Sequence, residues 1–289
     1  MSGEGNLARI FVKKLNYQYE PIIIQSNKFL KKYKFLNYKY ISPLIGVIYG
    51  WYRFILGRKF SYVNYLPLWN FLIFLLLPPN TILGPITGGS KFLQNKKNFI
   101  RKIIFPLFYK MSELILKIRK IKAIFATDLL KDQLDKDFCK KSDFNFIFNA
   151  LKKNKKNKKD IDFLIYYRKH KNKEDHFPLK FIKNLLDLRC SVHIIGNYLK
   201  LNGVKNHGYV NRAKLNYLLS KTKFTLGSGE SLYTFFNIEC INNFVKIILD
   251  SNYNFKIKFL KKHFYVLNFK KISSIRKIKF FISGNYRYR

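Results

Sequence analysis

The segment Asp162-Phe163-Leu164-Ile165-Tyr166-Tyr167 opens the part of the chain that decides the fold. Its nearly unbroken apolar character predicts a strand buried on both faces. The same alternation of strand and helix continues after it, with expected helices over 179–188, 211–220 and 231–243 and expected strands over 191–196, 223–226 and 245–249. Strands that alternate with helices are typical of parallel sheets covered on both faces.

The first half of the chain has a similar but weaker pattern. It predicts helices over 6–15, 69–77 and 99–120, the last kinked or broken at Pro106. It also predicts strands over 21–24, 62–65, 81–83, 123–126 and 144–148, and a glycine-rich loop over 84–90. The expected fold class is therefore α/β, with two doubly wound, Rossmann-like parallel-sheet domains that face a cleft. The expected boundaries are a first domain over 1–151, an exposed Lys-rich linker over 152–159, a second domain over 160–255 and a basic tail over 256–289.

Composition limits the class of protein. The chain has 289 residues, of which 48% are hydrophobic, so it can build sizeable cores and is not globally disordered. Its three cysteines, Cys139, Cys190 and Cys240, are widely spaced and odd in number. That pattern argues against a disulfide framework or a cysteine-based zinc site and favours a reducing compartment.

The charge is strongly positive, with 56 Lys+Arg against 16 Asp+Glu and a formal net charge of +40. The excess is mostly Lys and accompanies abundant Asn, Ile, Phe and Tyr, residues that an AT-rich genome favours. The densest run, 152–159, has no interleaved aromatic side chains for stacking on bases, which weakens a nucleic-acid interpretation. Such a surface still favours anionic lipids.

The segment Met1–Gly5 is polar and does not resemble a signal peptide. The longest apolar run, 66–77, is shorter than the roughly 20 residues that a spanning helix needs. It predicts a buried helix or an interfacial segment. We therefore expect a cytoplasmic protein, either free or peripheral on the inner face of the plasma membrane.

Charged residues and glycines follow the predicted strands of the second half in a particular order. They are Arg168, Lys173, Gly196, Gly208-Tyr209-Val210, Glu230, Ser231 and Glu239. This order resembles the C-terminal nucleotide-sugar-binding domain of the GT-B glycosyltransferases, in particular the retaining group 1 (family 4) enzymes. The resemblance implies that Arg168 and Lys173 hold the donor pyrophosphate, a role that suits cations facing a departing diphosphate.

The resemblance also assigns acidic residues to the donor. Glu239 matches the glutamate that binds the ribose hydroxyls, and Gly196 and Val210 lie at donor-binding positions. Glu230 resembles a second, catalytic glutamate that contacts the donor sugar, but it lies nine residues before Glu239 instead of eight. Strict spacing places Ser231 at that position, so both alternatives stay open. Tyr167 also departs from the family, which often has glycine there.

The first half resembles the acceptor domain of these enzymes more weakly. Gly3 and Gly5 are similar to the glycine loop that follows its first strand, and Gly88 and Gly89 are similar to a loop lining the same cleft. The strand expected before Gly3 is missing, which suggests a misplaced start or a truncated copy. The resemblance implies a retaining, metal-independent transferase with no cofactor, whose substrates are a nucleotide-sugar and a glycan or lipid-linked acceptor in surface polysaccharide (lipopolysaccharide) biosynthesis.

Two other hypotheses remain open on the sequence. The charge allows a basic RNA-associated protein of the organellar ribosomal type, and the departures in spacing allow an inactive relative of the glycosyltransferases. Asp135-Lys136-Asp137 and Asp160-Ile161-Asp162 fit an Asp-x-Asp metal motif, but their Lys-rich surroundings favour ordinary surface positions. The five histidines share no metal-ligand spacing.

Overall fold

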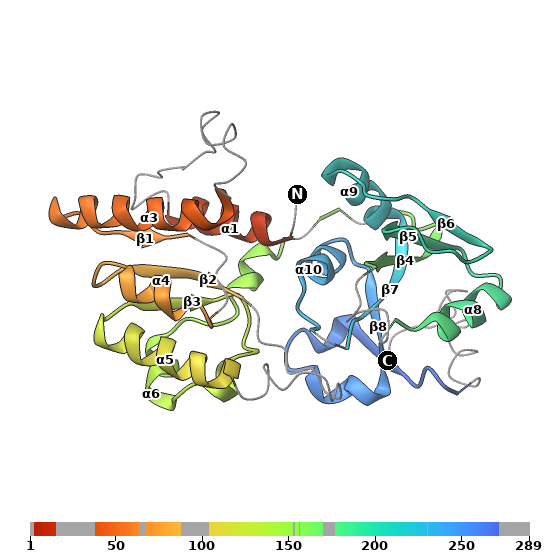
Figure 1. Cartoon of the computed structure of the whole chain (residues 1–289). Helices are drawn as coiled ribbons and strands as arrows, with labels where there is room; N and C mark the ends of the chain where they lie inside the picture. Colours follow the sequence, from red (N-terminus) through yellow and green to blue (C-terminus); the bar gives the residue numbers. More distant parts are fainter. Residues whose placement is uncertain are drawn as a thin grey trace. The chain divides into compact units, whose positions relative to one another are not determined.

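The structure is a computed structural model that describes residues 3–15, 38–63, 68–87, 104–152, 154–155, 157–169, 177–229 and 231–271. Its internal contacts divide the chain into two compact units, Ser2–Asn149 and Ala150–Arg289. Each unit is built on a parallel sheet with helices packed against it (Figure 1). The predicted mixed α/β class with parallel sheets is confirmed.

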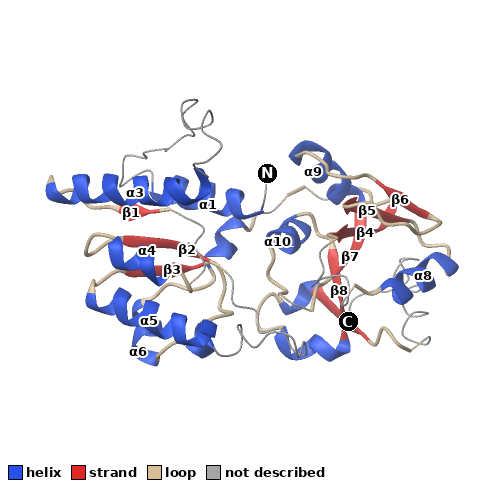
Figure 2. Ribbon diagram, in the orientation of Figure 1, coloured by secondary structure: helices blue, strands red, loops and turns tan. Residues whose placement is uncertain are grey.

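The unit Ser2–Asn149 contains a sheet of three parallel strands in the order β1-β2-β3. The strands are β1 (Ser61–Tyr62), β2 (Ile82–Ile86) and β3 (Lys122–Phe125). The helices are α1 (Gly3–Leu15), α3 (Tyr38–Ile55), α4 (Phe71–Leu76), α5 (Phe105–Ile118) and α6 (Lys136–Lys141), with 3₁₀ turns η2 (Lys131–Gln133) and η3 (Phe146–Ala150). Figure 2 shows helices above and below this sheet as drawn. The core between them contains Phe74, Leu83, Leu116 and Phe125, all almost completely buried.

The loop predicted to begin at Gly84 is wrong for its first three residues. The strand β2 continues through Gly84-Pro85-Ile86, where a loop was predicted. A Cβ on Gly84 would lie 2.7 Å from the Ile124 carbonyl oxygen, so glycine lets β2 approach β3 closely. Pro106 lies in the first turn of α5, where its missing N–H has no intrahelical partner to lose. The part of the predicted helix over 99–103 lies outside the described residues, so the predicted kink or break is not tested.

Two further predictions in this unit need correction. The strand predicted over 144–148 is absent, because Asn145 adopts a left-handed backbone (φ 61°) and the chain turns into η3. Gly3 and Gly5 do not form a loop; they lie in the first turns of α1, which is anchored by the buried side chains of Leu7 and Phe11. The strand predicted over 21–24 and the glycines Gly88 and Gly89 lie outside the described residues.

The unit Ala150–Arg289 contains a sheet of six parallel strands in the order β6-β5-β4-β7-β8-β9. The strands are β4 (Ile161–Tyr167), β5 (Val192–Gly196), β6 (Val204–Asn206), β7 (Thr222–Leu226), β8 (Lys246–Asp250) and β9 (Phe264–Leu267). The helices are α8 (Leu179–Asp187), α9 (Arg212–Lys221) and α10 (Phe235–Asn242), with 3₁₀ turns η4 (Ser251–Lys256) and η5 (Lys261–His263). Numbered within the unit, the strand order is 3-2-1-4-5-6, the order of nucleotide-binding doubly wound sheets.

The sequence predicts β4, β5, β7 and β8 to within one or two residues at each end, and it misses the edge strands β6 and β9. Because β9 pairs with β8, residues 264–267 belong to the sheet and not to a separate basic tail. The helix α10 begins at Phe235 instead of Ser231, because the Thr234 side chain caps it by accepting a hydrogen bond from the Asn237 N–H (3.2 Å).

The Lys-rich stretch before β4 is not a fully exposed linker, contrary to the prediction. The Lys159 ammonium donates to three carbonyl oxygens, of Thr222 (2.6 Å), Phe244 (2.7 Å) and Asn243 (3.0 Å). Burial lowers the pKa of Lys159 to about 8. This lysine therefore fixes the start of β4 to the end of α9 and to the turn after α10.

No helix in the described ranges has both the length and the apolar character that crossing a bilayer requires.

Candidate functional site

The candidate site lies at the carboxyl edge of the six-stranded sheet, where the chain changes direction. From β4 the chain moves outward to β5 and β6, then returns to the other side of β4 to form β7, β8 and β9. The loops after β4 and β7 therefore leave adjacent strands in opposite directions. In open α/β sheets, ligands bind at this switch point.

The loop after β4 is held against the loop after β5 by two hydrogen bonds, both made by Asn197. The Asn197 N–H donates to the Tyr167 carbonyl oxygen (2.9 Å), and the Asn197 side-chain oxygen accepts from the Lys169 N–H (2.8 Å). Arg168 lies between these two anchored residues, and its side chain is exposed. Its guanidinium makes no hydrogen bond or ion pair with any residue that the structure describes. A cation is thus present at the switch point, and no acidic side chain in the described ranges pairs with it.

The contact between the loops after β4 and β5 requires glycine at position 196. Its φ is +100°, and a Cβ there would overlap the Tyr167 carbonyl oxygen and lie 2.9 Å from the Tyr166 ring. The Gly196 N–H donates to the Gly208 carbonyl oxygen (2.9 Å). Three features that the sequence places far apart, the ends of β4 and β5 and the Gly208 turn, therefore meet here. Val210 beyond that turn is half-buried and packs against the hydrophobic core, so it supports the site by packing.

The loop after β7 is also fixed. The Gly227 N–H donates to the Ile248 carbonyl oxygen (2.8 Å), and the Lys256 ammonium donates to the Gly229 carbonyl oxygen. Ser231 is half-buried at the far end of this loop, just before α10. The amino end of α10 follows the carboxyl edge of the sheet, and the positive end of a helix dipole attracts anions.

Glu239 lies in α10 with only 9% of its side chain exposed. Its Oε1 forms an ion pair with Nη2 of Arg212 at 3.1 Å, and Arg212 begins α9 with 59% of its side chain exposed. Burial raises the pKa of Glu239, while the charge of Arg212 opposes that shift. A buried carboxyl group held by an exposed arginine is a candidate for ligand binding.

An aromatic contact links Glu239 to the end of β4. The ring of Phe236, one helical turn before Glu239, packs against the ring of Tyr166 with their centroids 5.7 Å apart. Tyr166 in turn lies two residues before Arg168. The first turn of α10 therefore packs beside the strand end that carries the exposed cation.

Sequence reasoning did not find Arg212, because nothing distinguishes it from the other Lys and Arg residues until α9 and α10 are packed together. Arg168, Gly196 and Gly208 belong to connected loops, and Ser231 and Glu239 belong to the adjoining loop and helix. Lys173 and Glu230 lie outside the described residues.

The aspartates of both Asp-x-Asp motifs form ion pairs with lysines. In the second unit, Asp160 pairs with Lys221 (3.7 Å) and Asp162 pairs with Lys223 (2.9 Å). These contacts give the two aspartates structural roles at the amino edge of the sheet.

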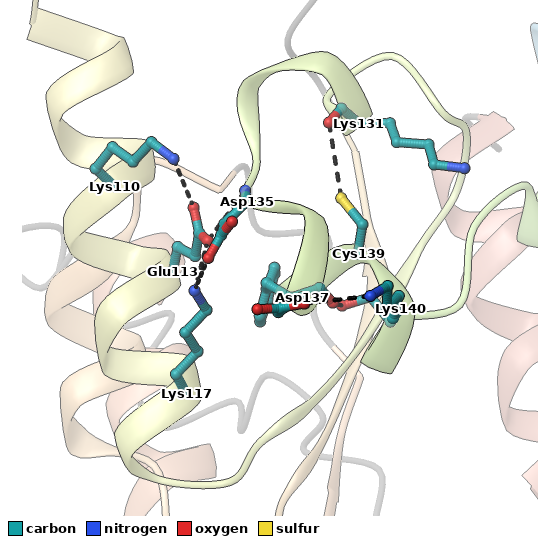
Figure 3. Close-up of polar contacts among 10 residues, drawn as sticks. Lys110, Glu113, Lys117, Lys131, Asp135, Asp137, Cys139 and Lys140 are labelled. Atoms are coloured by element: carbon teal, nitrogen blue, oxygen red, sulfur yellow. Dashed lines mark hydrogen bonds and ion pairs between the residues drawn. The ribbon is translucent and has the colours of Figure 1, made fainter.

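The other motif belongs to a polar cluster in the first unit (Figure 3). The buried carboxylate of Glu113 accepts from the ammonium of Lys117 (3.0 Å) and from the Asp135 N–H (3.1 Å), while Lys117 also contacts the Asp135 carboxylate (2.6 Å). Asp137 instead contacts Lys140 (3.4 Å). The cluster ties α5 to the start of α6.

Protein-family models were compared with the chain, and so were curated proteins. Neither comparison finds a match.

Because Glu239 is buried, we predict that its ionisation lowers the free energy of unfolding as pH rises. The folded protein holds the Glu239 proton to higher pH than the unfolded chain does, so the charged carboxylate destabilises the fold as pH rises above the unfolded value near 4.5. We expect Glu239→Gln to gain stability relative to wild type from pH 4 to pH 7, measured by urea unfolding at each pH. A constant difference across that range would contradict the assignment of a raised pKa.

Proposed function

We propose that the unit Ala150–Arg289 binds a nucleotide-sugar and that the chain is a glycosyltransferase of the retaining, group 1 (family 4-like) GT-B type. The observation that carries this proposal is the exposed Arg168 directly after the central strand of a 3-2-1-4-5-6 parallel sheet, next to a helix that contains the buried Glu239. Sheets with this strand order bind nucleotides at that position. The resemblance in residue order supports a donor in which the nucleotide carries a sugar.

The proposed chemistry breaks the bond between the anomeric carbon and a phosphate oxygen and forms a bond from that carbon to an acceptor hydroxyl oxygen. The nucleoside diphosphate leaves with the bonding electron pair, and the hydroxyl proton is released as the new bond forms. Arg168, together with Lys173, stabilises the charge that develops on the diphosphate, and the amino end of α10 adds a positive dipole. The nucleotide-sugar is a substrate, and the proposed step uses no cofactor.

The remaining residues orient the donor. Glu239 is proposed to accept hydrogen bonds from the ribose hydroxyls, with Arg212 fixing the carboxylate in place. Glu230 or Ser231 contacts the transferred sugar. The unit Ser2–Asn149 is proposed to bind the acceptor, a glycan or a lipid-linked glycan of surface polysaccharide synthesis. The compartment that suits this role is the cytoplasm.

A calorimetric titration tests the proposal. Wild-type protein is titrated with UDP-glucose, GDP-mannose and unmodified UDP and GDP, and we expect saturable binding of at least one nucleotide-sugar. Lys158→Ala, which removes an exposed cation before β4 at the opposite edge of the sheet, should bind equally well. A folded protein that binds none of these ligands but binds RNA with a steep salt dependence would instead support the RNA-associated alternative.

A further inference from the structure

The first unit contains a long stretch with no acidic residue. Between Pro21 and Ser112 the sequence has 14 Lys and Arg residues and no Asp or Glu. This stretch includes all of α3 and α4 and the first half of α5. Helices α3 and α4 and the first half of α5 therefore lie in a region of the chain that carries only positive charge, which complements an anionic surface. The second half of α5 adds one acid, the buried Glu113, which is paired with Lys110 and Lys117.

Helix α3 has an apolar face on each side. Its inner face contacts the sheet, where Val47 is buried and a Cβ on Gly46 would lie 3.0 Å from the Tyr62 ring. Its outer face carries Leu44, Ile48, Tyr52 and Ile55 at helical spacing, with Ile48 69% and Ile55 77% exposed. A helix at the surface of a soluble domain ordinarily has polar side chains on the outer face.

The neighbouring helices repeat this arrangement. Leu72 of α4 is 61% exposed. In α5 the exposed large apolar side chains are Leu107 (59%), Met111 (37%), Leu114 (59%) and Ile118 (71%), which again share one face at intervals of four, three and four residues. The exposed Lys110 and Lys117 lie beside them. The opposite face of α5 carries the buried Leu116. All three helices therefore direct apolar side chains both inward and outward.

Helix α4 is in contact with both α3 and α5 (Figure 1). The indole N–H of Trp51 in α3 donates to the Leu76 carbonyl oxygen at the end of α4 (2.7 Å). The rings of Phe71 in α4 and Phe108 in α5 pack with centroids 5.2 Å apart. We define the outer apolar side chains of this layer, Ile48, Ile55, Leu72, Leu107, Leu114 and Ile118, as the α3–α5 surface.

We propose that the α3–α5 surface inserts into the interface of an anionic lipid bilayer. A membrane supplies both an apolar interior for these side chains and negative headgroups for cations such as the exposed Arg58 and Lys59, which follow α3, and Lys120, which follows α5. A second copy of the chain is a poorer occupant, because the charged side chains of α3, α4 and α5 are all Lys or Arg apart from the buried Glu113, so two such surfaces would repel each other. This inference depends on the unit Ser2–Asn149 alone and not on the proposed donor site.

Vesicle flotation tests the proposal. We expect wild-type protein to float with vesicles of phosphatidylcholine and phosphatidylglycerol and to bind pure phosphatidylcholine vesicles much more weakly. The pair Ile55→Ser and Ile118→Ser removes apolar area without changing charge, and we expect about tenfold or more weaker binding to the anionic vesicles. Tyr217→Ser, at a 62% exposed position on α9 in the other unit, is the matched control and should bind like wild type.

Tryptophan fluorescence distinguishes insertion from adsorption by charge. Trp51 and Trp69 are the only tryptophans of the chain, and both lie in or beside this layer. We expect their emission to shift to the blue on anionic vesicles and to be quenched by brominated lipid. A separate pair, Ile48→Ser and Leu114→Ser, replaces the first if circular dichroism shows that the first does not fold. Wild-type binding by a folded serine pair, unchanged emission, or no binding to anionic vesicles would each overturn the proposal.

Discussion

Arg168→Ala is expected to lower kcat/KM for sugar transfer by a factor of about 10²–10³. This is the loss that follows when one charge-stabilising hydrogen-bond donor is removed from an active site. The guanidinium lies immediately after β4, between the anchored residues Tyr167 and Lys169. Because its side chain is exposed and makes no ion pair within the described residues, its removal should leave the fold intact.

The measurement is the initial rate of transfer from the nucleotide-sugar that binds best in calorimetry, with Lys158→Ala as the matched control. Arg168→Lys should recover part of the lost rate, since it restores the charge but not the two-pronged geometry of the guanidinium. Equal rates for wild type and Arg168→Ala would remove this residue from the proposed mechanism.

Gly196→Ala is expected to destabilise the second unit by more than about 3 kcal/mol. The added Cβ would overlap the carbonyl oxygen of Tyr167, and the backbone at position 196 has a φ of +100°, which residues with a side chain rarely adopt. Both effects act at the junction where the loops after β4 and β5 meet. The substitution should therefore also weaken nucleotide-sugar binding in the protein that remains folded.

Gly208→Ala is the control for Gly196→Ala. Gly208 also has a left-handed backbone (φ +66°), but a Cβ there would have no heavy atom within 4 Å. It should cost only about 1–2 kcal/mol, from backbone strain alone. Urea unfolding of both variants separates the two effects, and similar losses would show that the predicted overlap at Gly196 is relieved by a small backbone shift.

The sequence predicts the centre of the second sheet well because β4, β5 and β8 consist mostly of apolar residues, and β7 keeps Phe224 and Leu226 at alternate positions. The edge strand β6 (Val204–Asn206) has only one apolar residue, so its pairing with β5 leaves almost no local signal. The strand β9 is different. Phe264-Tyr265-Val266-Leu267 is a continuous apolar run that the basic residues around it obscured.

The first half shows where local signals fail. The largely apolar segment Phe144–Phe148 suggested a strand, but the left-handed backbone of Asn145 ends extended structure there. Gly84 and Pro85 suggested a loop, although they lie within a strand whose neighbour approaches too closely for a side chain. In both places the tertiary environment overrides the local preference.

The candidate site was predictable only in part. Strand ends followed by glycine or a cation, as at Arg168 and Gly196, can be found from the sequence, because parallel strands bring their carboxyl ends to one edge. The ion pair of Glu239 with Arg212 depends on the packing of α10 beside α9, and the sequence contains no pattern that indicates it.

Hydrogen exchange in the presence and absence of saturating UDP and GDP tests most directly whether the switch point of the six-stranded sheet binds a nucleoside diphosphate. We predict slower exchange in peptides that cover 166–169, 196–198 and 227–239, with no change in peptides at the opposite edge, around Lys158 and Lys159. Unchanged exchange in all three segments under saturating nucleotide, or protection confined to the opposite edge, would contradict the account.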